Sequence, residues 1–291
     1  MAMWPTLMPG AVASSRNPLH ASLTEIGHMS SSIGRKIQAA IDRMRGKERQ
    51  VDPADAWGVS RRDARKFAQP TGALEAVFYG HKGRIAQKWH HYLEIYERHF
   101  EPLRQQGQPL RILELGVSRG GSLEIWRNYF GPQARIVGID IDPACVERVD
   151  PENTVMIGDQ SDPAVLSAAV ERLGGGVDLV IDDGSHLGRY QIPTFEYLYP
   201  RISERGVYVC EDLHCSYWPT HEGGLRREGT FAEHVKTLID KLQGWYLDGD
   251  AQTAAMPFAS TTYGIFVYLD LIVIEKRPIS RPFHVQMGEP S

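Results

Sequence analysis

Short apolar runs alternate with segments of helical spacing between residues 111 and 214, and this alternation limits the possible folds more than any other feature. The apolar runs lie at 111–117, 134–141, 154–160, 177–186 and 206–214. The helical spacing occurs between them, at 122–130, 163–176 and 192–202. Strands that alternate with helices of this length form βαβ units, and near-continuous apolar runs are typical of strands covered on both faces. The pattern predicts an α/β fold with a doubly wound, mostly parallel sheet.

The C-terminal part adds a helix and a hairpin to this pattern. Residues 230–243 have helical spacing, and residues 264–277 hold two β-branched runs with almost no connector. Strands joined this closely pair antiparallel, so we expect a hairpin at the edge of a seven-stranded sheet. We assign residues 109–277 to the α/β domain and 278–291 to a tail.

The N-terminal part has a different composition. Residues 1–30 are rich in Ala, Ser, Pro and Met and show little periodicity, which predicts a disordered leader. Residues 31–108 are expected to form a helical arm or lid, because 33–48 and 84–103 have helical spacing. The apolar face of the second stretch carries Trp89, Tyr92, Tyr96, His99 and Phe100.

Charge and cysteine content exclude several classes of protein. The formal net charge is -4 and there is no Lys/Arg run of five, which disfavours nucleic acid or an anionic membrane as a partner. The three cysteines have no zinc-binding spacing and fit a reducing compartment. No apolar run is long enough for a membrane span, and the N-terminus lacks the basic start of a signal peptide. We expect a soluble, cytoplasmic protein and leave homo-oligomerisation open.

A glycine-rich loop follows the first apolar run. It reads GxxxGG from Gly116, with Glu114 two places before it. A dinucleotide pyrophosphate would favour GxGxxG. The observed loop suits a zwitterionic amino-acid tail such as that of S-adenosylmethionine, with backbone N–H groups for the carboxylate and an acid for the ammonium. A glycine loop alone is often only a turn, so the assignment depends on the strands that follow. The cofactor contacts expected here are Glu114, Gly116, Ser118, Gly120, Gly121 and Ser122.

Polar residues end the next strands. Asp140 ends the second run, where an acid can hold both ribose hydroxyls, while Asp142 next to it has the position of a helix cap. Asp159 and Gln160 end the third run, where a side chain can meet the adenine amino group. Each acid alone has an ordinary alternative as a loop residue or cap. Together with Asp182 on the fourth run, they are expected to contact the cofactor.

Carboxylates and histidines gather after the fourth and fifth runs. Asp183 and His186 follow the fourth, and Glu211, Asp212 and His214 follow the fifth. Parallel neighbouring strands bring these ends together, where the carboxylates would repel one another. Oxygen ligands favour Mg²⁺ or Mn²⁺, so Asp183, Glu211 and Asp212 are the predicted metal ligands. His186 is the predicted general base for an acceptor hydroxyl. The alternative is that such acids cap helices and His186 is merely polar.

Aromatic residues follow this cluster, on a glycine-flanked loop. Tyr217 and Trp218 are placed to stack on a sugar ring, with His214 beside them. Simple packing of Trp218 on the sheet edge explains its presence equally well. A small-molecule sugar or glycoside is the partner this pattern favours.

The motifs together resemble a known family. Asp183-Gly-Ser-His186 followed by Glu211-Asp212, preceded by the Glu114–Ser122 loop, is similar to the metal-dependent macrolide-sugar O-methyltransferases, which are class I enzymes using S-adenosylmethionine. The stretch 88–99 is similar to the segment that covers their active site. The resemblance spans residues 79–277 and implies Mg²⁺ at Asp183, Glu211 and Asp212, with His186 as the base. It also implies O-methylation of a sugar hydroxyl in antibiotic biosynthesis.

Two other functions fit the same fold. A nicotinamide-dependent oxidoreductase is disfavoured by GxxxGG in place of GxGxxG. A catalytically silent cofactor-binding partner protein is disfavoured by the retained set of mutually repelling acids.

Overall fold

The computed structural model describes residues 70–149 and 153–289, and a single mixed sheet organises them. The predicted leader 1–30 and the predicted helix 33–48 lie outside the described residues. The sheet has seven strands in the order β3-β2-β1-β4-β5-β7-β6. The strands are β1 (Arg111–Leu115), β2 (Arg135–Asp140), β3 (Thr154–Ile157), β4 (Val177–Asp182), β5 (Ile202–Cys210), β6 (Thr262–Val267) and β7 (Ile272–Lys276). This confirms the predicted doubly wound α/β class.

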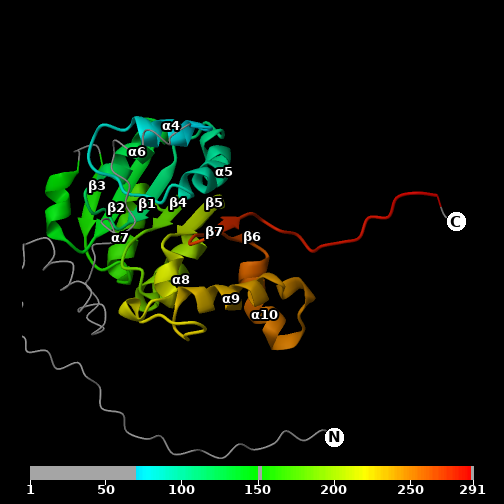
Figure 1. Ribbon diagram of the computed structural model, residues 1–291. Helices are drawn as coiled ribbons and strands as arrows, with labels where there is room; N and C mark the ends of the chain where they lie inside the picture. Colours follow the sequence, from blue (N-terminus) through cyan, green and yellow to red (C-terminus); the bar gives the residue numbers. More distant parts are fainter. Residues whose placement is uncertain (1–69, 150–152, 290–291) are drawn as a thin grey trace, which may run out of the picture. The chain divides into compact units, whose positions relative to one another are not determined.

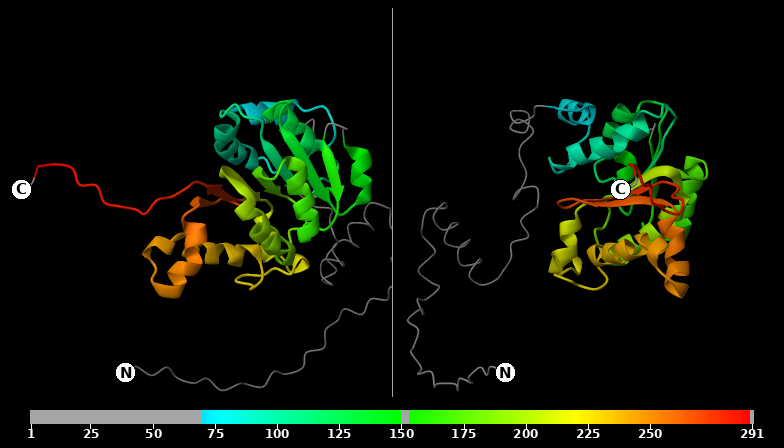
Figure 2. Two further views of the ribbon diagram at one scale, coloured as in Figure 1. Left: turned by 180° about the vertical axis from the view of Figure 1, so that it is seen from behind. Right: turned by 90° about the vertical axis from the view of Figure 1, so that its right-hand side faces the viewer.

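Helices cover both faces of the sheet (Figure 1). One face packs against α4 (Ala73–Gly80), α5 (Tyr92–Arg104) and α6 (Gly121–Phe130). The opposite face packs against α7 (Pro163–Leu173), α8 (Gly188–Leu198), α9 (Phe231–Leu242) and α10 (Gly249–Ala259). The second view in Figure 2 shows these two helical layers on either side of the strands.

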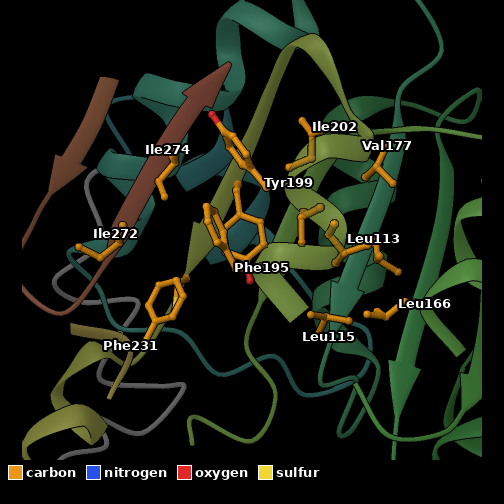
Figure 3. Close-up of a cluster of buried hydrophobic side chains, with 14 of the residues drawn as sticks. Leu113, Leu115, Leu166, Val177, Phe195, Tyr199, Ile202, Phe231, Ile272 and Ile274 are labelled. Atoms are coloured by element: carbon orange, nitrogen blue, oxygen red, sulfur yellow. The ribbon is translucent and has the colours of Figure 1, made fainter. Parts of the chain in front are cut away.

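The core of the second layer shows why the strands are apolar on both sides. Leu113 and Leu115 of β1 and Ile274 of β7 contact aromatic side chains of the helices, among them Phe195 and Phe231 (Figure 3). All five are at most 3% exposed. Full burial of such a side chain contributes about 1.5–3 kcal/mol, so this layer holds the strand ends in fixed positions.

Local signals set the helix ends, and one of them, Asp142, was predicted. Asp142 accepts a hydrogen bond from the backbone N–H of Ala144, which confirms its role as a cap. Asp162 caps α7 in the same way, and Gly174 ends that helix with a left-handed φ of 98°. Thr230 caps α9 through the N–H of Glu233.

The structure corrects the bounds of one predicted helix, confirms the terminal hairpin and adds a helix that was not predicted. The helix expected over 84–103 begins at Tyr92, and 84–91 has no helix because this stretch instead lies against the strand ends. The terminal antiparallel hairpin at the edge of the sheet is confirmed; its connector is 268–271, and its second strand, β7, lies between β5 and β6. The helix α10 was not predicted, since its sequence contains Pro257 and lacks a clear apolar stripe.

The described part of the predicted tail, residues 278–289, contains no helix or strand, and residues 281–289 are exposed. Among residues 70–149 and 153–289, no helix has the length and hydrophobicity that crossing a membrane requires.

Candidate active site

The glycine loop joins β1 to α6 and touches the end of β4. Gly116 has a φ of +85°, and its N–H donates to the carbonyl of Ile139 at 2.8 Å. A Cβ at this position would lie 2.0 Å from the carbonyl oxygen of Asp183. Only glycine fits such a close approach, so the proposed cofactor loop and the acidic cluster are in direct backbone contact. Gly120, also at positive φ, precedes the first turn of α6, which begins at Gly121 and Ser122.

Asp140 braces this loop. One of its oxygens accepts the N–H groups of Val117 and Ser118 at 2.8 and 2.9 Å, and the other accepts the N–H of Asp142 at 2.8 Å. Burial opposes ionisation, but these backbone donors prevail and lower the pKa of Asp140. The end of β2 therefore carries an anionic side chain beside the glycine loop, and a contact between Asp140 and a ribose stays a prediction.

Glu114 is fully buried beneath the loop. One oxygen accepts a hydrogen bond from the Ser122 hydroxyl at 2.9 Å, while Oε1 has no hydrogen-bond partner and lies 3.9 Å from Nζ of Lys88. Burial raises the pKa of Glu114 to about 7, against the opposing charge of Lys88. A buried acceptor without a partner is costly, so Oε1 is suited to receive a donor from a ligand.

The remaining predicted cofactor residues make contacts within the protein. Asp159 accepts bonds from the N–H and hydroxyl of Ser161. Asp182 is fully buried, with one oxygen bonded to Gln160 Nε2 at 3.0 Å and the other to the Tyr208 hydroxyl at 2.7 Å. The Oε1 of Gln160 accepts the N–H of Ser185. The structure thus places Asp182 beneath the site, where it orients Gln160, and a direct cofactor contact of Asp182 stays a prediction.

The acidic ends of β4 and β5 converge, as predicted. Asp183, His186 and Asp212 offer ligand atoms that all lie within 4.8 Å of one another. His186 Nε2 is 3.8 Å from Asp183 and 3.6 Å from Asp212. Both His186 and Asp212 have left-handed φ angles, 55° and 52°. Such conformations are uncommon outside glycine and gather at functional sites.

Glu211 joins the cluster through a lysine that the sequence analysis did not assign. Nζ of Lys88 lies 2.5 Å from Asp183 Oδ2 and 2.7 and 2.8 Å from the two oxygens of Glu211. The lysine side chain is 3% exposed. Although burial opposes the charge, Asp183 and Glu211 raise the pKa of Lys88, and burial raises that of Glu211. Glu211 is thus linked to Asp183 through Lys88, but it is not among the residues whose ligand atoms lie within 4.8 Å of one another, and one ion shared by Asp183, Glu211 and Asp212 stays a prediction.

Two more residues of the same stretch hold Asp212. The indole N–H of Trp89 and the hydroxyl of Tyr92 both donate to Asp212 Oδ1, at 2.9 and 3.0 Å. The resemblance to the family placed this stretch over the active site, but the helical periodicity assigned its aromatic side chains to a helix face. No local pattern signals that Lys88 is buried among acids.

A second pair of residues, His214 and Asp270, lies beside the cluster. His214 Nδ1 lies 2.6 and 2.7 Å from the oxygens of Asp270, on the hairpin connector. The ring of His214 also contacts Trp89 edge-on and Trp218 at 4.2 Å between centroids. Trp218 is 38% exposed and Tyr217 45%. Trp218 therefore presents part of its ring to solvent next to the cluster, and stacking on a sugar stays a prediction. Asp270 is a residue that the sequence analysis missed.

The known proteins that this chain resembles are methyltransferases. Residues 83–213 match the FtsJ-like methyltransferase family. The chain is 36% identical over 257 residues to 8-demethyl-8-(2-methoxy-alpha-L-rhamnosyl)-tetracenomycin-C 3'-O-methyltransferase of Streptomyces olivaceus, covering 78% of this chain and 64% of that protein. It is 33% identical to mycinamicin VI 2''-O-methyltransferase of Micromonospora griseorubida, covering 64% of this chain and 48% of the relative.

Solved structures extend the likeness to three dimensions. A structure of MycE methyltransferase from the mycinamycin pathway, in complex with Mg and SAH, aligns with a TM-score of 0.59 at 32% identity, over 66% of this chain and 51% of that one. The chain thus spans about half to two thirds of the length of the relatives named here. In sequence and in fold, residues 83–213 of this chain are thus similar to the FtsJ-like methyltransferases.

Proposed function

We propose that this protein is an S-adenosylmethionine-dependent O-methyltransferase that uses a divalent metal and acts on a sugar hydroxyl of a glycosylated natural product. The observation that carries the proposal is the cluster of Asp183, His186 and Asp212 next to the Gly116 loop, with Glu211 joined to Asp183 through Lys88. The relatives named above are methyltransferases, which favours this cofactor over a nicotinamide dinucleotide.

The side chains fit both proposed ligands. Carboxylate oxygens are the donors that Mg²⁺ and Mn²⁺ prefer, so Asp183, Glu211 and Asp212 would hold the ion. When bound, such an ion supplies Lewis-acid stabilisation of an alkoxide oxygen. The Oε1 of Glu114, which accepts no hydrogen bond, and the N-terminus of α6 at Gly121 and Ser122 suit the two charges of an amino-acid tail.

His186 is the proposed base. Its Nε2 lies 3.6–3.8 Å from Asp183 and Asp212, beside the proposed metal ligands, where it would take the proton of the acceptor hydroxyl. The oxygen would then attack the sulfonium methyl, and alignment of the two reactants by the surrounding residues would supply much of the acceleration.

The proposed acceptor is a sugar attached to a polyketide. One relative is named for a rhamnosyl-tetracenomycin acceptor, and one MycE structure contains mycinamycin VI. In this chain, Trp218 and Tyr217 would stack on the sugar and His214 would bind a hydroxyl.

The test is a methyl-transfer assay with S-adenosylmethionine over a panel of rhamnosyl and other deoxysugar glycosides, with and without EDTA. We expect transfer to at least one glycoside, loss of transfer on chelation and recovery with Mg²⁺ or Mn²⁺. Transfer that persists after complete metal removal would reject the metal assignment. Reduction of a nicotinamide cofactor without methyl transfer would reject the reaction.

A further inference from the structure

Lys88 occupies the oxygens that the proposed metal would use. Its ammonium contacts both oxygens of Glu211 and one of Asp183, all at 2.5–2.8 Å, and Glu114 Oε1 is 3.9 Å away. Three carboxylates thus surround one buried cation. Neither Lys88 nor Glu211 has more than 3% of its side chain exposed, so water screens these contacts little.

A divalent ion and this ammonium compete for the same ligands. Metal–oxygen bonds of Mg²⁺ are about 2.1 Å long, so an ion bound by Glu211 and Asp183 would share its oxygens with a second positive charge only a few ångströms away. Two cations at that separation in a buried site repel strongly. The Oδ1 of Asp212 accepts hydrogen bonds from Trp89 and Tyr92 rather than from Lys88.

The stretch that carries Lys88 is held by contacts other than those of the lysine. The neighbouring residues have anchors of their own: Arg84 pairs with Glu124 at 2.6 Å, and Trp89 bonds to Asp212. The four-carbon stem of a lysine is flexible. The position of this stretch therefore does not depend on the Lys88 ammonium alone.

We propose that Lys88 is a tethered cation that holds Asp183 and Glu211 together in the metal-free protein and is displaced when a divalent ion binds. Lys88 is then a positioning residue that keeps the acidic site assembled and sets how tightly metal binds. This inference rests on the proposed metal site, at which the Lys88 ammonium competes with the metal ion.

The experiment measures metal affinity of the full chain by isothermal titration with Mg²⁺ and by electron paramagnetic resonance with Mn²⁺. Lys88→Met removes the competing charge and is expected to tighten metal binding by about tenfold or more. Lys88→Arg keeps a cation and should stay within a few-fold of the unsubstituted protein. Lys82→Met is the matched control, because Lys82 is exposed on the same stretch, and its affinity should not change. Unchanged or weaker binding by Lys88→Met, with normal binding by the unsubstituted protein, would overturn the inference while leaving the proposed function intact. Failure of every form to bind either ion would overturn both.

A second measurement needs no substitution at Lys88. Acetic anhydride labelling of the unsubstituted protein, read by mass spectrometry, should leave Lys88 unmodified without metal and modify it with saturating Mg²⁺, while Lys82 is modified in both states. Equal protection of Lys88 with and without metal, under conditions in which titration shows the ion bound, would overturn the displacement.

Discussion

Asp270 clamps the imidazole of His214 from the hairpin connector: it accepts from Nδ1 at 2.6 and 2.7 Å and from the backbone N–H of the same histidine at 2.6 Å. The two residues are 56 positions apart, and the clamp fixes the ring between Trp89 and Trp218. Because Nδ1 donates its proton to Asp270, Nε2 is left to meet a ligand.

The first prediction tests this clamp. Asp270→Asn removes the charge that orients His214, and we expect the KM for the glycoside acceptor to rise about tenfold, with little change in S-adenosylmethionine affinity. Steady-state kinetics with each substrate varied in turn gives the answer. Asp250→Asn, on α10, serves as the control. An equal loss of cofactor affinity would remove Asp270 and His214 from the acceptor side.

The second prediction concerns the proposed base. His186→Ala is expected to lower kcat by about 10²- to 10⁴-fold, which is the usual contribution of general acid–base catalysis. Cofactor affinity by isothermal titration should change little, because the Gly116 loop and Asp140 do not depend on the imidazole. His214→Ala should lower kcat less than His186→Ala does. Normal turnover of the His186→Ala protein would contradict the assignment of His186 as the general base.

The third prediction uses the close contact at Gly116. Gly116→Ala places a Cβ 2.0 Å from the Asp183 carbonyl and requires a left-handed φ, so we expect a stability loss of about 2 kcal/mol or more together with loss of cofactor binding. Gly80→Ala is the matched control, because a Cβ there meets nothing within 4 Å. Chemical denaturation and cofactor titration measure both effects. Normal stability of Gly116→Ala would contradict the contact.

The fourth prediction is a pH dependence far from the site. Asp178 accepts two side-chain bonds and one backbone bond from Arg111, at 2.7–2.9 Å. Burial opposes ionisation, but these bonds outweigh it and lower the pKa of Asp178 below its ordinary 3.8. A lowered carboxyl pKa stabilises the fold above the ordinary value, and that stability is lost as pH falls through the lowered one.

Asp178→Asn should therefore destabilise the protein by about 1–2 kcal/mol at pH 7, after allowance for partial exposure of the pair. The difference from the unsubstituted protein should shrink between about pH 4 and pH 2. Urea denaturation at several pH values measures it, and metal affinity at pH 7 should be unchanged. A difference that grows on acidification would contradict the assigned direction.

The sequence by itself determined the features that depend on local order along the chain. Apolar runs in alternation with helical segments specify a parallel sheet, and the end of each parallel strand falls at the same edge. That rule was enough to bring Asp183 and His186 together with Glu211 and Asp212, and to place Gly116 beside them. The cap at Asp142 was readable for the same reason, since its partner Ala144 lies two residues away.

Only the tertiary structure decided the contacts that join distant segments. Lys88 reaches Glu211 across 123 positions, and β7 enters the sheet between β5 and β6. Helical spacing around Trp89 predicted a helix, but the stretch is irregular. In this conformation Lys88 and the indole N–H of Trp89 bind carboxylates that would otherwise be buried without partners. Such long-range electrostatic demands leave no period in the local sequence, so the partners of the acidic site became visible only once the strands were assembled.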